Sequence, residues 1–316
     1  KVNEADSVDV LWSPEQIEGH NREYLRYRAQ GDPAVYYDLY DVMKNVLGKP
    51  NVNPETGRDE GYGSFPVAKF RVPVDTALVR KNGTVNANDI VLPEIRLDIP
   101  KDKLDGGLVK SDFIILNIIA TNQWKRPIFF AVTCAPDSKI GLDEYLWFHG
   151  LAWRLEPRKI NREDMGLNKD VLEQNLYNEP ETFSTTPQYG YKFRGISDPG
   201  VYFDENTTRL MLNYRSAFIR LAMYYLNVEP DTQKGIAALE RMEQLIPNEK
   251  IPMGWELMSD LSNLYFRFGR VDRFNELSSQ LETVAQGMIA SGQANLNSYY
   301  NPYRVLLDIY ETRKDH

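Results

Sequence analysis

The sequence has 316 residues, a length typical of about two domains. Lys and Arg total 37 against 45 Asp and Glu, so the net charge of −8 argues against a protein that coats nucleic acid. Apolar runs such as Phe113–Leu116 and Ile128–Val132 are much shorter than the ~18 residues that a membrane-spanning helix needs. Composition therefore predicts a soluble, folded, acidic chain.

The first residues carry two helix-start signals. Ser13-Pro14-Glu15-Gln16 reads as an N-cap, a proline at the first helical position and a capping-box glutamine, which predicts a helix over 14–30. Asp32-Pro33 repeats the signal, and Gly48 is suited to end a second helix. We therefore expect an N-terminal helical segment over residues 1–60.

The middle of the chain is predicted to alternate strands with helices. Strands are expected at Phe70–Val74, with an edge proline, and at Glu94–Ile99, where polar and apolar residues alternate. Leu108–Trp124 predicts an amphipathic helix, and further strands follow at Ile128–Thr133 and Leu151–Leu155. A strand, a helix and a strand at this spacing predict a crossover unit.

The C-terminal third repeats itself. Leu221–Leu226 matches Leu261–Phe266 at an offset of 40 residues, and Lys234–Leu239 is followed about 39 residues later by Arg273–Leu277. This is a helix–turn–helix repeat of the tetratricopeptide kind, slightly longer than the ~34-residue standard. Asn301–Thr312 could supply a last, capping helix.

These patterns together predict a small mixed α/β domain followed by an all-α domain of helical hairpins. The N-terminal helical segment over 1–60 precedes an α/β domain over 61–200 and a tetratricopeptide-like repeat domain over 201–316. A long region rich in Asn, Pro and Gly ends the α/β domain, and we predict one helix in it, around Lys169–Tyr177.

Motifs for metal or cofactor chemistry are weak. His20, His149 and His316 are far apart, and there is no glycine-rich phosphate loop, so we predict neither a metal site nor a cofactor. The single cysteine, Cys134, excludes an internal disulfide framework. Because it follows an apolar run, we expect it to be a small buried hydrophobe.

Five motifs occur in a familiar order: Phe70–Asp75, Lys81–Val85, Leu92–Pro100, Asn122–Phe130 and Gly150–Leu155. From about residue 60 to 316 the chain resembles the soluble C-terminal region, a domain of unknown function, of a bacterial family of multi-spanning membrane proteins. Animal relatives of that family are protein O-mannosyltransferases. Tetratricopeptide-like repeats end this region in the family.

The resemblance implies a periplasmic domain of a parent protein in the bacterial inner membrane. In that family the hydrophobic N-terminal half carries the sugar-transfer site and uses a lipid-linked donor. None of that half is in this sequence, so no catalytic residue is assigned, and membrane contact is expected only through the missing half. Lys1 opens the sequence without Met, which agrees with a piece of a longer parent.

The favoured function is non-catalytic recognition of an acceptor polypeptide, or assembly with the membrane half of the parent, through the concave face of the helical repeats. The expected binding residues are outward positions of the repeat helices: Asn213, Arg220, Asn263 and Arg267. Two alternatives stay open. The α/β domain could itself be a hydrolase or transferase with a site near Arg126, His149 and Trp153, or the chain could be a free-standing repeat scaffold.

Overall fold

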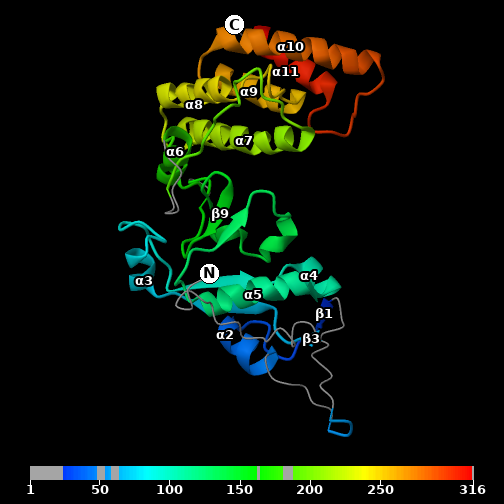
Figure 1. Ribbon diagram of the computed structural model, residues 1–316. Coiled ribbons are helices and arrows are strands. Elements are labelled where there is room, and N and C mark those ends of the chain that lie inside the picture. Colours follow the sequence, from blue (N-terminus) through cyan, green and yellow to red (C-terminus); the bar gives the residue numbers. More distant parts are fainter. Residues whose placement is uncertain (1–23, 48–53, 58–63, 162–163, 181–187, 315–316) are drawn as a thin grey trace. The chain divides into compact units, whose positions relative to one another are not determined.

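The computed structural model describes residues 24–47, 54–57, 64–161, 164–180 and 188–314 (Figure 1). The chain forms two compact units. The first comprises Lys1–Phe148 with Ala152–Asn161, and the second comprises His149–Leu151 with Arg162–His316. The α/β part and the helical part predicted from the sequence are both confirmed. The predicted boundaries at residues 60 and 200 stay a prediction.

Within its described residues, the first unit holds three sheets of three strands each. The middle strands are β1 (Tyr24–Tyr27), β4 (Lys69–Pro73) and β9 (Ala152–Leu155). Strand β1 lies between β3 (Ser64–Phe65) and β6 (Leu108–Val109). Strand β4 lies between β2 (Tyr37–Asp38) and β5 (Glu94–Asp98), and β9 lies between β7 (Phe129–Ala131) and β8 (Leu146–Phe148). Of the six strand pairs in the described part of the chain, β1–β3 and β2–β4 are parallel and the other four are antiparallel.

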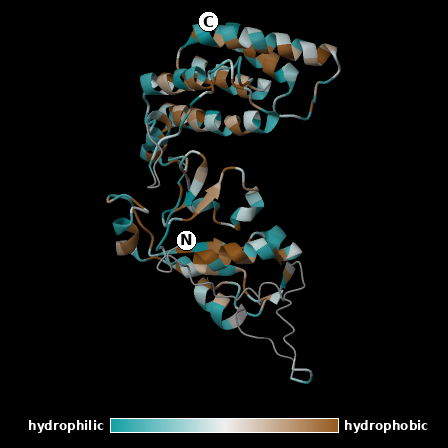
Figure 2. Cartoon of the chain, viewed as in Figure 1, coloured by the Kyte–Doolittle hydropathy of each residue, from teal (hydrophilic) through white to brown (hydrophobic). Residues whose placement is uncertain are grey.

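The helices of the first unit are α2 (Leu39–Asp41), a π-helical turn (Val42–Leu47), α3 (Thr76–Lys81), α4 (Lys101–Gly106), α5 (Lys110–Asn122) and two 3₁₀ turns (Pro136–Lys139 and Asp143–Tyr145). Figure 2 shows α5 as a mainly apolar helix, and its buried side chains Phe113, Leu116 and Ile119 share one core with β4 and β5.

Buried apolar residues alternate with exposed charged residues along β4 and β5, and this pattern explains why the two strands pair with one face toward the core. Phe70 lies opposite Leu97 in the register, and both side chains are buried, whereas Arg71 and Arg96 on the other face are exposed. Pro73 fits at the end of β4 because β2 pairs only with its first residues, leaving no second ladder there that needs an N–H.

Three predictions for the first unit are wrong. Residues 24–27 form a strand, because pairing with β3 and β6 buries Leu25 and packs Tyr27 against Phe65, with their ring centroids 5.3 Å apart. The earlier part of the predicted helix lies outside the described residues. Strands β5 and β7 belong to different sheets, so the predicted crossover unit between them does not form. Cys134 is exposed, because it lies in the turn after β7.

The second unit is a run of paired helices: α6 (Lys169–Tyr177), α7 (Glu205–Asn227), α8 (Thr232–Leu245), α9 (Trp255–Arg267), α10 (Val271–Ala290) and α11 (Pro302–Lys314). Helix α7 packs on α8, α9 packs on α10, and α11 packs on α10 (Figure 1). The 40-residue offset relates α7 to α9, and the 39-residue offset relates α8 to α10. The predicted helical repeats are therefore confirmed.

A tyrosine–carboxylate hydrogen bond recurs between successive helices. The Tyr265 hydroxyl on α9 donates to Glu243 on α8 at 2.5 Å, and the Tyr310 hydroxyl on α11 donates to Glu282 on α10 at 2.6 Å. Tyr225 on α7 donates in the same way to Glu173 on α6. Burial and the neighbouring carboxylate raise the pKa of Tyr225 and of Tyr265. Helix α6 therefore takes the place of a preceding repeat's second helix.

We expect Tyr265→Phe to lower the free energy of unfolding by about 1.5–3 kcal/mol, the usual contribution of a buried hydrogen bond to a charged group. The Tyr265 side chain is fully buried, so water cannot replace the lost donor. Urea denaturation followed by far-ultraviolet circular dichroism measures the loss. Tyr202→Phe is the control, since Tyr202 is 87% exposed, and equal losses for the two variants would contradict the prediction.

Candidate functional site

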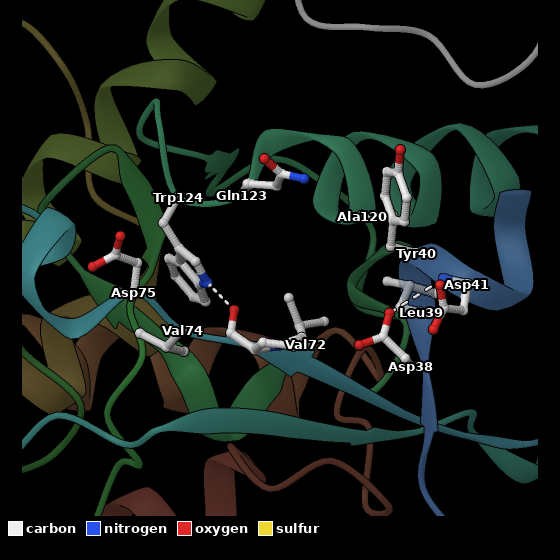
Figure 3. Close-up of a pocket in the computed structure, with 11 residues that line it drawn as sticks. Asp38, Leu39, Tyr40, Asp41, Val72, Val74, Asp75, Ala120, Gln123 and Trp124 are labelled. Atoms are coloured by element: carbon white, nitrogen blue, oxygen red, sulfur yellow. Dashed lines mark hydrogen bonds between the residues drawn. The ribbon is translucent and has the colours of Figure 1, made fainter.

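A pocket of about 530 Å³ opens in the first unit (Figure 3). Its walls come from the start of α2, the end of β4 and the C-terminal end of α5. The lining residues are Asp38, Leu39, Tyr40, Asp41, Val72, Pro73, Val74, Asp75, Ala120, Gln123 and Trp124. Two motifs noted in the sequence, 70–75 and 122–130, therefore meet at this pocket.

Trp124 is held firmly against β4. Its indole Nε1 donates to the carbonyl oxygen of Pro73 at 2.8 Å, and its own carbonyl accepts from Asn82 Nδ2 at 2.7 Å. Gln123 and Trp124 have φ values of 48° and 63°, a left-handed conformation that ends α5 and turns the chain toward the sheet. Such conformations are unfavourable for residues other than glycine, so these contacts must hold them.

Two of the three carboxylates that line the pocket, Asp38 and Asp75, cap helices. Asp75 Oδ1 accepts from the backbone N–H groups of Ala77 (3.1 Å) and Leu78 (2.9 Å) as the N-cap of α3. Asp38 Oδ1 accepts from the N–H of Asp41 at 3.2 Å at the start of α2. Among the described residues, no group of three or more His, Cys, Asp or Glu side chains is placed to hold a metal ion.

The two predicted site residues of the first unit lie outside this pocket lining. Arg126 is half-buried just after α5, and its backbone N–H donates to Asn122 Oδ1 at 3.2 Å. Trp153 lies on β9, with its ring centroid 4.9 Å from that of Phe148 and 4.9 Å from Lys139 Nζ. His149, named with them in the enzyme alternative, is buried in the second unit.

A polar stripe runs along α7 and α9, which are neighbours in the second unit. It contains the four predicted residues of the repeats and two more, at spacings that place them on one face of each helix. On α7 the stripe is Asn213, Arg220 and Asn227, and on α9 it is Asp260, Asn263 and Arg267. Arg267 Nη2 donates to Asn227 Oδ1 at 3.0 Å, which joins the two helices.

Asn227 and Asp260 were not predicted, although the repeat offset points to both. Residue 227 is 40 positions before Arg267, and residue 260 is 40 positions after Arg220. Asp260 Oδ2 accepts from the hydroxyl of Tyr300 at 2.7 Å, and burial together with this bond raises the pKa of Tyr300. The segment before α11 is thereby tied to α9.

Exposure differs along the stripe. Asn263 and Arg267 are exposed, whereas Asn213 and Arg220 are half-buried, and burial lowers the pKa of Arg220. Each asparagine carries a carboxamide that can both donate and accept, as a peptide group does. The stripe therefore carries carboxamide donors and acceptors beside two guanidinium groups.

Comparison with known proteins places the chain in a family. No curated protein and no solved structure matches the chain. No helix in the described part of the chain has the length and apolar character needed to span a bilayer. The model of the family described as TMEM260-associated domain 2 matches residues 1–175, which is more than half of the chain. This match confirms the association with a membrane-protein family that the motifs predict. The chain belongs to the TMEM260-associated domain 2 family.

Proposed function

We propose that this chain is a non-catalytic accessory domain of a glycosyltransferase-like membrane protein related to the protein O-mannosyltransferases. It lies on the periplasmic side of a bacterial inner membrane and binds acceptor polypeptide in an extended form. Membership of a family associated with a membrane protein supports the accessory role. The membrane-embedded half of the parent is the second partner in this proposal.

The observation that carries the proposal is the polar stripe shared by α7 and α9. Arg267 and Asn227 occupy equivalent places in successive repeats and are joined by a hydrogen bond, so the two helices present one continuous surface. An extended polypeptide leaves its N–H and C=O groups unpaired, and the carboxamides of Asn213 and Asn263 can pair with them. Stacked helical repeats commonly bind partners on such a surface.

The pocket of the first unit supports the proposal that the first unit has a structural role and the helical repeats bind the acceptor. Asp38 and Asp75 each use a carboxylate oxygen to cap a helix, which is a structural task. Trp124 contributes its indole N–H to the backbone of β4. These side chains favour a role in shaping the first unit, and they leave acceptor recognition to the repeats.

The test uses the double variant Asn263→Ala with Arg267→Ala. Both side chains are exposed, and the Arg267–Asn227 hydrogen bond that the variant loses is also exposed, so we expect the melting temperature to stay close to that of the wild-type chain. Binding to Ser/Thr-rich peptides of about 12 residues, which span ~40 Å when extended, is measured by fluorescence anisotropy. Losing two hydrogen bonds of ~0.7 kcal/mol each should weaken binding about tenfold.

The matched control is Asn275→Ala with Gln280→Ala, two exposed polar positions on α10. It removes as many polar side chains from the same unit but leaves the stripe intact. Equal binding by the wild-type chain and the stripe variant, or equal losses for stripe and control variants, would contradict the proposal. Arg220 is not a suitable choice, because it is half-buried and its removal would also change stability.

A further inference from the structure

Helix α11 presents a row of large apolar side chains to solvent. Tyr303 is 53% exposed, Leu307 54% and Tyr310 39%. Their spacings of four and three residues place them on one face of the helix. The opposite face, with Val305 and Ile309, is buried.

The recurring tyrosine–carboxylate bond aligns α11 with the earlier helices, because Tyr310 takes the place of Tyr265 and Tyr225. In this alignment Tyr303 corresponds to Met258 and Phe218, and Leu307 corresponds to Ser262 and Ala222. All four counterparts are buried, with at most 7% exposure. The face exposed on α11 is therefore the face that the fold covers on α7 and α9.

A further helical hairpin is a poor cover for this face. At the position of Leu307, α7 has alanine and α9 has serine, and small residues let the second helix of each hairpin approach closely. The leucine of α11 projects further and would hold such a helix away. A projecting leucine is better suited to packing beside a second leucine.

The charges on the edge of this face suit a second copy of the same helix. At 100° per residue, the exposed Arg304 and Glu311 lie about 40–60° to one side of Leu307, and Tyr303 and Tyr310 lie about 40–60° to the other side. Both pairs are centred on Leu307 to within half a residue. Two antiparallel copies would therefore place Arg304 opposite Glu311 of the partner subunit, twice by symmetry.

We propose that α11 is a homodimer interface in which two antiparallel copies pack about a two-fold axis at Leu307. Leucine meets leucine at the centre, and the tyrosines pack on one edge. On the other edge an arginine–glutamate pair forms at each end. The Arg304 guanidinium already lies 5.1 Å from the ring centroid of Tyr299, which positions it at this edge.

The first test measures the oligomeric state of the full chain by analytical ultracentrifugation, from about 1 to 100 µM, the range of weak association. Arg304→Glu and Glu311→Arg each place like charges opposite one another, and each should weaken the dimer about tenfold or more. The double exchange restores opposite charges and should restore the dimer. Arg209→Glu, at an exposed site on α7, should have no effect.

A second test does not depend on charge. In a Cys134→Ser background, Leu307→Cys places two thiols at the two-fold axis, and mild oxidation should give a covalent dimer. Asp308→Cys is the matched control, since residue 308 is exposed but points away from the proposed axis. A monomer at all concentrations, no rescue by the double exchange, or equal cross-linking at 307 and 308 would overturn the proposal.

Discussion

Arg215→Ala is expected to lower the free energy of unfolding by about 3–5 kcal/mol, because it breaks a buried polar network and opens a cavity. Arg215 lies on α7 and has no exposed surface. Its Nη2 donates to the carbonyl oxygen of Ile246 at 2.9 Å and to that of Ile251. Both carbonyls lie within the connection between α8 and α9, so one side chain secures the turn between two repeats.

Burial lowers the pKa of Arg215 to about 10, which still leaves the guanidinium charged at neutral pH. Its Nε and Nη1 have no hydrogen-bond partner among the described residues. Arg215→Met fills the same space without burying a charge, so we expect it to lose less stability than Arg215→Ala. Urea denaturation of both variants measures the difference. A loss for Arg215→Ala no larger than that for Arg209→Ala, an exposed site on the same helix, would refute this role.

Gly141→Ala should lower the free energy of unfolding by about 2–4 kcal/mol. Gly141 has a φ of +79°, a conformation that an alanine adopts only with strain. An added Cβ would also overlap the carbonyl oxygen of Asp98, at the end of β5. That oxygen is part of the backbone and cannot move aside without disturbing the strand.

Gly83 provides the matched control, because alanine there would have the strain of a positive φ without the overlap between the added Cβ and a neighbouring atom. It belongs to the same unit and has a φ of +71°, but nothing lies within 4 Å of an added Cβ. Gly83→Ala should therefore lose only about 1 kcal/mol. Thermal and urea denaturation of the two variants give the comparison, and equal losses would show that the Asp98 carbonyl is not the obstacle.

The helical repeats were predictable because their signals are local and occur twice. Leu221–Leu226 and Leu261–Phe266 mark the same turns of α7 and α9, and the helix predicted around Lys169–Tyr177 coincides with α6. A helix satisfies its backbone within one segment, so its sequence pattern identifies it directly.

The sheets were less predictable because pairing is decided between distant segments. The strand β1 pairs with β3 and β6, which lie about 40 and 80 residues further along the chain, and the Ser-Pro signal near residue 13 carries no information about them. Strand positions such as β4 and β5 follow from alternation. The placement of β5 and β7 in different sheets could not be predicted in this way, because the alternation of polar and apolar residues does not identify the strand with which another strand pairs.

Four of the six residues of the polar stripe were predicted from the sequence. Asn213, Arg220, Asn263 and Arg267 were all expected to be outward positions of the repeat helices. Of these four side chains, the structure exposes Asn263 and Arg267 and leaves Asn213 and Arg220 half-buried. The hydrogen bond between Arg267 and Asn227 depends on how closely α7 and α9 approach, which the sequence does not state. The pocket beside Trp124 was not predicted, because it arises where segments from three parts of the chain meet.

The recurring tyrosine–carboxylate bond also governs how the helical unit can open. Each bond couples one helix only to the helix before it, so the repeats behave as a chain of nearest neighbours rather than as a single cooperative block. The last link, between α10 and α11, includes the half-exposed Tyr310, whereas the links at Tyr225 and Tyr265 are buried. Among the described helices we therefore expect α11 to open more readily than α7 or α9 and its amide hydrogens to exchange with solvent sooner, and a second subunit bound to α11 should slow that exchange.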